Sequence, residues 1–539
     1  MTTNDQRLTI DAYTLSDSMS DDYSLLIVSD LHLSEGRDPL TGKVSRNEDF
    51  FFDDDFAEFL TYHQHSQKKW KLVINGDFID FLQITSQPDC GTPGLLTDRT
   101  YGLKTGERES VWKLQRVVAG HQQVFESLGQ FAIQNKIVII SGNHDIEFYY
   151  PQVQETFLRE LESRVQADQQ GKIRTNIEFH PWFYFDGVLY VEHGHQYDRL
   201  NSFTYVLDPR LPNTRMIKAS EQEHIDLPLG SLFVRYLFNR VEISTPFADN
   251  IKPATRFIGW FVRNHPVQAL GFLFKEGREM FRRLKAKWHW LSDSAFADRK
   301  ASHDSRMKRL AAVLAEQHSS SAADWKKSLE CLDNLRIPSL MRGPTPRKWK
   351  FFKYLLGPIR TPVLALVGAL IAVSGIFLIL APLVKRAIPQ FLLSFSAPLQ
   401  GSFDPWWPVF EETIRVLFLL ELIFSFLWFL YLRKERSRRS ESSRLRERAS
   451  QIHGLLDVKY VVMGHTHEAD LHDSGPNRHY FNTGTWTKVF GEEERVLREE
   501  KEFTFVRVTG TRQNRQARLM KWEAGSKTAR LAYLFSQLW

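Results

Sequence analysis

The stretch KLVINGDFID, residues 71–80, decides the fold class of this 539-residue chain. The run Lys71–Asn75 has the length and the valine and isoleucine content of a buried strand. It ends in Gly76 and Asp77, a tight turn that presents a carboxylate. Because loops after the strands of an open α/β sheet face a common crevice, the stretch predicts a site at that edge of a sheet.

Four more strand-like runs end in polar motifs. These runs are Leu25–Ser29, Ile137–Ser141, Val188–Glu192 and Lys459–Met463. The motifs that follow are SDLH with Asp30 and His32, GNHD with Asn143, His144 and Asp145, EHGH with His193 and His195, and GHTH with His465 and His467. A single polar residue after a strand is usually a turn former, but five motifs in order indicate a functional site.

The side chains of these motifs are carboxylates, imidazoles and one amide. Such donors suit two adjacent divalent ions, with manganese as the first choice and iron, zinc or cobalt as alternatives. The chain has only two cysteines, Cys90 and Cys331, which argues against a thiolate zinc site and against a disulfide framework. Two ions about 3.5–4 Å apart clamp phosphate oxygens, so the pattern predicts metal-assisted hydrolysis of a phosphate ester.

With these motifs the chain resembles the calcineurin-like metallophosphoesterases, whose pattern is DxH, GD, GNH(D/E), HG and GHxH. FNTGTW, residues 481–486, is also similar to the strand and turn that follow GHxH in many members. The resemblance covers residues 22–200 and 452–510 and implies a four-layer α/β/β/α sandwich. SDLHL and GDFIDF are similar to the UDP-diacylglucosamine pyrophosphatases as well. Those enzymes have arginine where His144 stands and lack a spanning hairpin.

The resemblance implies a role for each motif residue. The implied metal ligands are Asp30, His32 and His467 for the first ion, Asp77 as the bridge, and Asn143, His193 and His465 for the second ion. His144 would contact the substrate phosphate and act as general acid, oriented by Asp145.

Two further motif residues have less specific roles. His195 is the alternative to His193 as a ligand, but the family pattern favours the histidine directly before glycine, and His195 would then line the substrate pocket. Asp80 either faces the substrate, supports the ligands, or is a solvated acid at a helix start.

A membrane hairpin is expected between the fourth and fifth motifs. Residues 363–384 contain no charge over 22 positions, long enough to cross a bilayer as a helix, and residues 414–432 form a second apolar run. Six basic residues precede the first run and eight follow the second, which predicts that both termini and the catalytic domain face the cytoplasm. In a bacterium this would be the inner, cytoplasmic membrane. The alternative for each run is a buried core helix.

The chain therefore divides into four expected parts. These are the N-terminal part of the phosphoesterase core at 22–200, a helical insertion at 201–345, the hairpin with basic flanks at 346–450, and the C-terminal part of the core at 451–539. The insertion mixes large apolar and basic residues at helical spacing. That pattern is typical of a membrane-surface helix and equally of a cap packed on the core.

The charge pattern argues against one class of binding partner. The net charge is +6, but much of the excess lies beside the hairpin, so nucleic acid is not an expected partner. We expect a membrane-anchored, dinuclear-metal phosphoesterase that acts on a lipid-linked or nucleotide-linked phosphate, with membrane lipids as neighbours. The alternatives are a UDP-diacylglucosamine-type pyrophosphatase, a protein phosphatase or nuclease of the same superfamily, and a non-catalytic membrane scaffold.

Overall fold

The chain forms two compact units, of which a computed structural model describes the first. Its described residues are 23–66, 68–88, 97–98, 101–211, 223–239, 296–337, 412–413, 441–488, 503–511 and 514–532. The first unit comprises Met1–Lys252, Gly271–Phe351 and Glu441–Trp539, and the second comprises Pro253–Leu270 and Phe352–Ser440. Of the second unit only Glu412 and Thr413 are among the described residues.

Within the described residues, the larger sheet has seven strands in the order β14-β13-β12-β1-β2-β5-β6. In chain order they are β1 (Ser24–Val28), β2 (Trp70–Asn75), β5 (Lys136–Ile140), β6 (Ile177–His180), β12 (Thr504–Thr509), β13 (Gln516–Glu523) and β14 (Thr528–Leu531). Strands β1, β2, β5 and β6 run parallel. Strand β12 is antiparallel to β1, and β12, β13 and β14 are antiparallel neighbours of one another. Every residue of β1, β2 and β5 is buried, as expected for parallel strands covered on both faces.

The second sheet has five strands in the described part of the chain, in the order β10-β11-β9-β8-β7. They are β7 (Phe183–Phe185), β8 (Leu189–Glu192), β9 (Tyr460–Met463), β10 (Asp470–Gly475) and β11 (Arg478–Asn482). Strand β9 pairs in parallel with β8, although more than 250 residues separate them. The two parts of the core predicted from the sequence therefore share one sheet.

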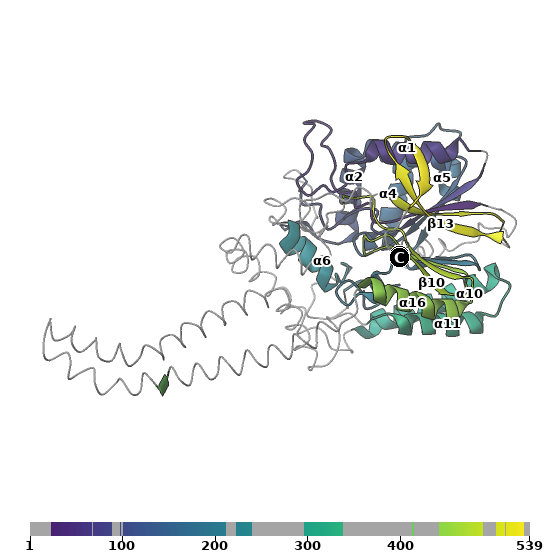
Figure 1. The fold of residues 1–539 in the computed structure, drawn as a ribbon. Coiled ribbons are helices and arrows are strands. Elements are labelled where there is room, and N and C mark those ends of the chain that lie inside the picture. The colour runs from purple at the N-terminus through teal and green to yellow at the C-terminus, as the bar shows by residue number, and fades with distance from the viewer. Residues whose placement is uncertain are drawn as a thin grey trace, which may run out of the picture. The chain divides into compact units, whose positions relative to one another are not determined.

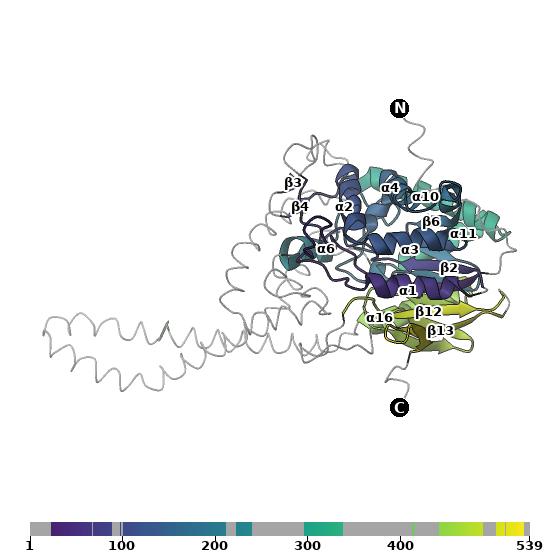
Figure 2. The same cartoon turned by 90° about the horizontal axis from the view of Figure 1, so that it is seen from above.

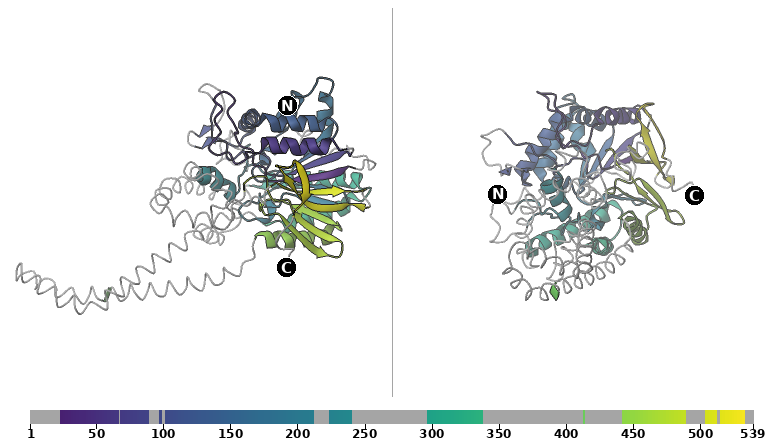
Figure 3. Two further views of the ribbon diagram at one scale, coloured as in Figure 1. Left: turned by 45° about the horizontal axis from the view of Figure 1, so that its top comes forward. Right: turned by 60° about the vertical axis from the view of Figure 1, so that its left-hand side comes forward.

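The two sheets pack face to face, and helices cover their outer faces (Figures 1 and 2). On the larger sheet lie α1 (Asp53–Gln64), α2 (Glu107–Gly120), α3 (Gln122–Ala132), α4 (Pro151–Glu162) and α5 (Gln170–Asn176). On the smaller sheet lie α10 (Ala297–Gln317), α11 (Ala322–Leu335) and α16 (Glu441–Leu456). Figure 3 shows the same layers from two other sides. The described unit is thus a mixed α/β sandwich of four layers.

Shorter elements occupy the loops. They are the hairpin β3 (Thr97–Asp98) and β4 (Gly102–Leu103), η2 (Ile146–Tyr149), η3 (His195–Tyr197), α6 (Leu229–Phe233) and the π-helical turn η5 (Val234–Phe238).

Alternation along the strands of the smaller sheet explains the two cores. In β9, Tyr460 and Val462 face the larger sheet, whereas Val461 and Met463 face the helices. In β8, Val191 likewise belongs to the core between the sheets. Successive side chains of a strand point to opposite faces, so a strand of apolar residues serves both cores. The outer core is completed by apolar residues of α10, α11 and α16.

The observed strands agree closely with those predicted from the sequence. Each of the five predicted strands lies within one residue of an observed strand. Helix α1 begins at Asp53, and three aspartates occupy its first turn. No helix in the described part of the chain is long and apolar enough to cross a membrane. The runs at 363–384 and 414–432 lie outside the described residues.

Candidate metal centre

The five motifs meet because their strands end at neighbouring positions. Strands β1, β2 and β5 are parallel neighbours in one sheet, as β8 and β9 are in the other. Backbone hydrogen bonds join the loops that follow: the amide of Asp30 donates to Gly76 O at 3.1 Å, and that of Gly464 donates to His193 O at 2.9 Å. The motif side chains therefore face one another across the edges of the two sheets.

The first candidate metal cluster is Asp30, His32 and His467. His467 Nε2 lies 3.2 Å from Asp30 Oδ1 and 3.1 Å from His32 Nε2. All three residues are buried, and their possible ligand atoms lie within 4.8 Å of one another. This is the set that the sequence predicts for the first ion.

The second candidate cluster is Asp77, His193 and His465. Asp77 Oδ2 lies 3.1 Å from His193 Nε2 and 3.7 Å from His32 Nε2. Asp77 also belongs, with His32 and His144, to a third grouping within the same distance limit. It therefore lies between the two clusters, as a bridging ligand must.

The buried polar atoms of these clusters fit a metal centre. Asp30 Oδ1, Asp77 Oδ2, Asn143 Oδ1 and His193 Nε2 are buried and accept or donate no hydrogen bond among the described residues. Buried polar atoms are almost always paired, and leaving one unpaired costs about 1–3 kcal/mol. Three of these atoms belong to residues of the clusters, and Asn143 is a predicted ligand of the second ion, so divalent ions are the partners that fit. Oxygen and imidazole donors without thiolate suit manganese, iron, zinc or cobalt.

Five of the predicted ligands have a left-handed backbone, with φ between 50° and 70°. They are Asp30, His32, Asp77, His465 and His467. This conformation is uncommon for residues with a side chain and costs on the order of 1 kcal/mol each, and such residues cluster at functional sites. The local strain is a second sign, independent of the donor atoms, that the loops are built to aim these side chains.

Glycines allow neighbouring motif loops to approach one another closely. A Cβ atom on Gly142 would overlap the Asp77 carboxylate, and one on Gly464 would overlap Ser29 Oγ and Asp30 Oδ2. The GNHD and GHTH motifs therefore need glycine for space against the neighbouring motif.

Other groups hold the ligand side chains in place. His193 Nδ1 donates to Asn75 O at 2.9 Å, which leaves Nε2 directed at Asp77. Asp198 Oδ2 lies 3.5 Å from His465 Nε2. Thr485 of the FNTGTW stretch donates its hydroxyl to Asp30 O at 2.8 Å. Such partners orient metal ligands and fix the histidine tautomer.

The orientation of His144 differs from the sequence-based expectation. Its Nδ1 lies 2.5 Å from Asp80 Oδ2, and the same oxygen is 3.0 Å from His32 Nδ1. The two oxygens of Asp145 instead accept the backbone amides of Phe78, at 2.8 Å, and Gly142, at 2.6 Å. Asp145 therefore fixes two motif loops, and Asp80 orients His144. The contact of His144 Nδ1 thus goes to Asp80, whereas the sequence-based expectation named the adjacent Asp145.

His195 lies beside the ligands rather than among them. Its ring centroid is 5.3 Å from that of His193 and 5.7 Å from that of Phe203. Burial, followed by the neighbouring His193 and His465, holds the pKa of His195 well below its ordinary value. His193, directly before glycine, is the histidine of the pair that belongs to a cluster.

The electrostatics of the site favour cations. Burial raises the pKa of Asp77, but His193 and His144 outweigh it and hold that pKa well below the ordinary value. Burial lowers the pKa of His193, but Asp77 and Asp30 raise it to about 9. Without metal, the carboxylates thus retain protons on nearby imidazoles. Metal ligation needs the neutral imidazole, so protons and metal ions compete for these side chains.

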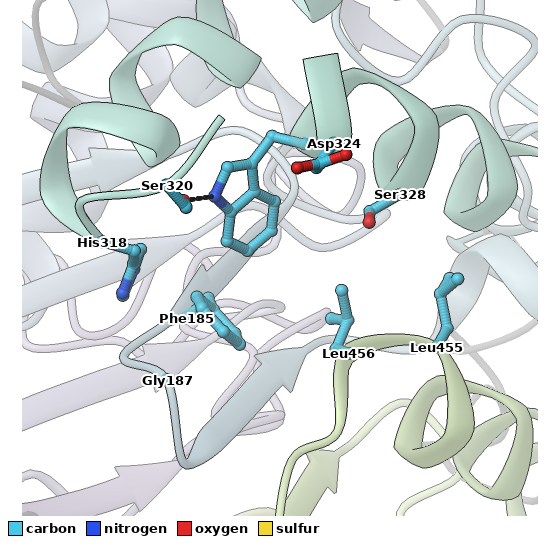
Figure 4. Close-up of a pocket in the computed structure, with 9 residues that line it drawn as sticks. Phe185, Gly187, His318, Ser320, Asp324, Ser328, Leu455 and Leu456 are labelled. Atoms are coloured by element: carbon cyan, nitrogen blue, oxygen red, sulfur yellow. Dashed lines mark hydrogen bonds between the residues drawn. The ribbon is translucent and has the colours of Figure 1, made fainter. Parts of the chain in front are cut away.

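A separate surface hollow of about 340 Å³ lies at the other end of β8 (Figure 4). It is lined by Phe185, Gly187, His318, Ser320, Asp324, Trp325, Ser328, Leu455 and Leu456. Gly187 precedes β8 and His193 follows it, so the strand separates this hollow from the metal clusters. None of these lining residues belongs to a motif.

Residues 23–231 match the family described as calcineurin-like phosphoesterase. The chain carries a calcineurin-like phosphoesterase domain. This family hydrolyses phosphoric esters with two divalent ions, and the chain is an enzyme of that class. No curated protein and no solved structure matches the chain significantly.

The phosphoesterase site includes residues beyond the matched range. His465 and His467 follow it by more than 200 residues, yet they enter the same clusters as Asp30 and Asp77. The part of the site that sequence reasoning missed is the Asp80–His144 contact. The signal was present in GDFID, where Asp80 follows Asp77 by three positions in one strand-end loop.

Proposed function

We propose that this chain is a dinuclear-metal phosphoesterase in which Asp77 bridges the two ions. The observation that carries the proposal is the position of Asp77, shared between a cluster with His193 and His465 and a grouping with His32. Asp30, His32 and His467 complete one ion site. Asn143 joins His193 and His465 at the other, since its Oδ1 is buried without a hydrogen bond among the described residues.

Each side chain then has a defined task. The bound ions supply Lewis-acid activation of water and neutralise the charge of the phosphate. Asp77 Oδ1 accepts the backbone amide of His144 at 2.9 Å, which places that residue next to the bridging carboxylate. Asp80 accepts from His144 Nδ1, so the proton for the leaving group is held at Nε2. His144 delivers it as the leaving oxygen departs, a role worth about 10²–10⁴-fold in rate.

We propose further that the enzyme is held at the cytoplasmic face of a membrane and acts on a lipid-linked or nucleotide-linked phosphate. The support is the sequence of two apolar runs at 363–384 and 414–432 with basic flanks. An anchored phosphoesterase is useful mainly when its substrate or a partner lies at the bilayer. Manganese is the metal we expect to bind.

The catalytic proposal is tested by hydrolysis of bis-p-nitrophenyl phosphate and of p-nitrophenyl phosphate by manganese-loaded protein, with metal content measured in parallel. We expect activity in the wild type and its loss in Asp77→Ala and Asn143→Ala. Asp324→Asn, a change at the distant surface hollow, is the matched control and should leave activity unchanged. A metal-free, inert wild type would support the scaffold alternative instead.

The membrane proposal has its own test. Reporter fusions within residues 385–412 should report the outer side of the membrane, and fusions at either terminus the cytoplasmic side. A cytoplasmic signal from the 385–412 fusions would contradict a spanning hairpin without affecting the catalytic proposal. Hydrolysis of a lipid extract by wild type but not by Asp77→Ala would then identify the substrate.

A further inference from the structure

The turn after Asp80 is held by side chains from three separate parts of the chain. Three successive carbonyl groups, those of Phe81, Leu82 and Gln83, each accept a side-chain hydrogen bond. The donors are Lys113 Nζ at 3.0 Å, Asn239 Nδ2 at 2.7 Å and Asn47 Nδ2 at 3.4 Å, respectively. These donors are all buried.

The same turn fixes the Asp80 carboxylate. Its Oδ1 accepts the amides of Leu82 and Gln83, both at 3.0 Å, while its Oδ2 contacts His144 and His32. Two peptide groups therefore link Asp80 to the buried donors. Each donates its N–H, that of Leu82 or Gln83, to Asp80 and accepts a hydrogen bond at its carbonyl oxygen from Lys113 or Asn239. A shift of this turn moves Asp80, and with it the imidazole of His144.

Burial of Lys113 at this position costs free energy. Its side chain is fully buried, and its ammonium contacts a carbonyl rather than a carboxylate. Glu147, which interacts electrostatically with Lys113, is itself buried and receives no hydrogen bond among the described residues at either oxygen. Burying an ammonium group costs several kcal/mol, and an apolar side chain of similar length would avoid that cost. A contact that is costly for stability points to a role in the site.

Asn239 comes from the insertion, beyond the family match that ends at residue 231. It follows η5, and the same segment reaches two other loops of the site. Ser231 Oγ donates to Asn143 O at 3.4 Å, and Arg235 Nη2 donates to Leu103 O. A π-helical turn at this point is consistent with a segment shaped for function rather than for helix stability.

We propose that Lys113 and Asn239 are positioning residues for Asp80. Through Asp80 they set the direction in which His144 delivers its proton to the leaving group. Neither residue belongs to a candidate metal cluster, so the inference rests on the proposed function but concerns different side chains. It also assigns residues 229–239 of the insertion a share in the catalytic geometry.

The test compares two leaving groups. A p-nitrophenolate ion leaves without a proton, whereas an alkoxide needs the general acid, so a misdirected His144 slows only alkyl esters. In Lys113→Met and Asn239→Leu we expect hydrolysis of an alkyl phosphate to fall at least about tenfold, in kcat rather than KM. Hydrolysis of p-nitrophenyl phosphate should change less than about twofold, with metal content unchanged. Lys113→Arg, which keeps a hydrogen-bond donor, should retain part of the alkyl-phosphate activity that Lys113→Met loses. Lys326→Met, at an exposed position of α11, is the control.

Hydrogen exchange provides a readout that does not depend on turnover. We expect the amides of Leu82 and Gln83 to exchange about tenfold faster or more in both variants, while amides of β13 remain unchanged. Equal losses on both esters, loss of metal, or unchanged exchange at Leu82 and Gln83 would overturn the proposal. A wild type inert toward both esters would refute the proposed function, and the exchange measurement would still decide the positioning role.

Discussion

Asp80 and His144 form a direct contact of 2.5 Å between a carboxylate oxygen and Nδ1. Because the same oxygen also reaches His32 Nδ1 at 3.0 Å, one carboxylate orients both the proposed acid and a proposed metal ligand. His32 and His144 meet edge to face, with ring centroids 4.7 Å apart. Asp80 therefore positions both the proposed general acid and one residue of the first candidate cluster.

Removal of the Asp80 charge should loosen the orientation of both His144 and His32. In Asp80→Asn we expect kcat for an alkyl phosphate to fall about 100-fold, because the amide orients His144 less firmly than the carboxylate does. Steady-state kinetics with metal analysis is the measurement. Asp145→Asn is the informative comparison, since Asp145 contacts backbone amides and should mainly lower thermal stability. A larger kinetic loss in Asp145→Asn than in Asp80→Asn would reverse the assignment.

Metal binding should release protons. The pKa of His193 is raised to about 9 and that of His32 lies well above its ordinary value, burial opposing both shifts and the nearby carboxylates outweighing it. Ligation by neutral imidazole therefore displaces protons at pH 7, and manganese affinity should weaken as the pH falls. Calorimetric titration in two buffers of different ionisation enthalpy measures the released protons. Identical heats in the two buffers would contradict this linkage.

His121 should make stability depend on alkaline pH. Its Nε2 and Nδ1 contact Glu48 at 3.1 Å and Asp53 at 2.9 Å. Burial lowers the pKa of His121, but the two carboxylates raise it to about 10. Because the pKa of His121 is higher in the folded state than in the unfolded state, protonation of His121 stabilises the fold. This contribution is fully present below the unfolded pKa of about 6.5 and is lost as the pH rises through 10.

The His121 ion pairs should account for a loss on the order of 4 kcal/mol between pH 6.5 and 10. Urea unfolding at both values measures the loss, and His121→Gln should lose less than the wild type by about this amount. If both proteins lose the same free energy, the His121 ion pairs do not contribute as described.

Helix α11 should belong to the same cooperative unit as the active site. Leu329 is fully buried in the core shared with the smaller sheet. Leu329→Ala should lower the free energy of unfolding by about 2–5 kcal/mol through the cavity it leaves. Thermal inactivation and loss of helical signal should move together, with exposed Lys326→Ala as control. If thermal inactivation of Leu329→Ala keeps the wild-type midpoint, the insertion helices unfold separately from the active site.

Much of the candidate site could be predicted from the sequence because its signals are local. Each predicted metal ligand follows an apolar strand by one to four positions, so the strand pattern and the motif together predict its place. What the sequence does not reveal is which carboxylate reaches His144, since Asp145 is adjacent in sequence and Asp80 is adjacent in space. Contacts such as Lys113 to Phe81 O and Asn239 to Leu82 O join distant segments and carry no local pattern.

The fold shows the same division between local and distant information. Amphipathic spacing in the insertion is compatible with a membrane surface or with a core, and the pattern itself does not distinguish them. In the structure the apolar faces of α10 and α11 pack on the smaller sheet and form its outer layer, whereas residues 240–295 of the insertion lie outside the described residues. Which partner a helix face covers depends on residues far away, here those of β8 and β9.

The central claim is that Asp77 bridges two ions in one phosphoesterase site. Electron paramagnetic resonance of manganese-loaded protein tests it most directly, together with metal stoichiometry. The account predicts two manganese ions per chain with an exchange-coupled signal in the wild type, and loss of that coupling in Asp77→Ala. A single ion per chain, or two ions with the signal of isolated manganese, would contradict it.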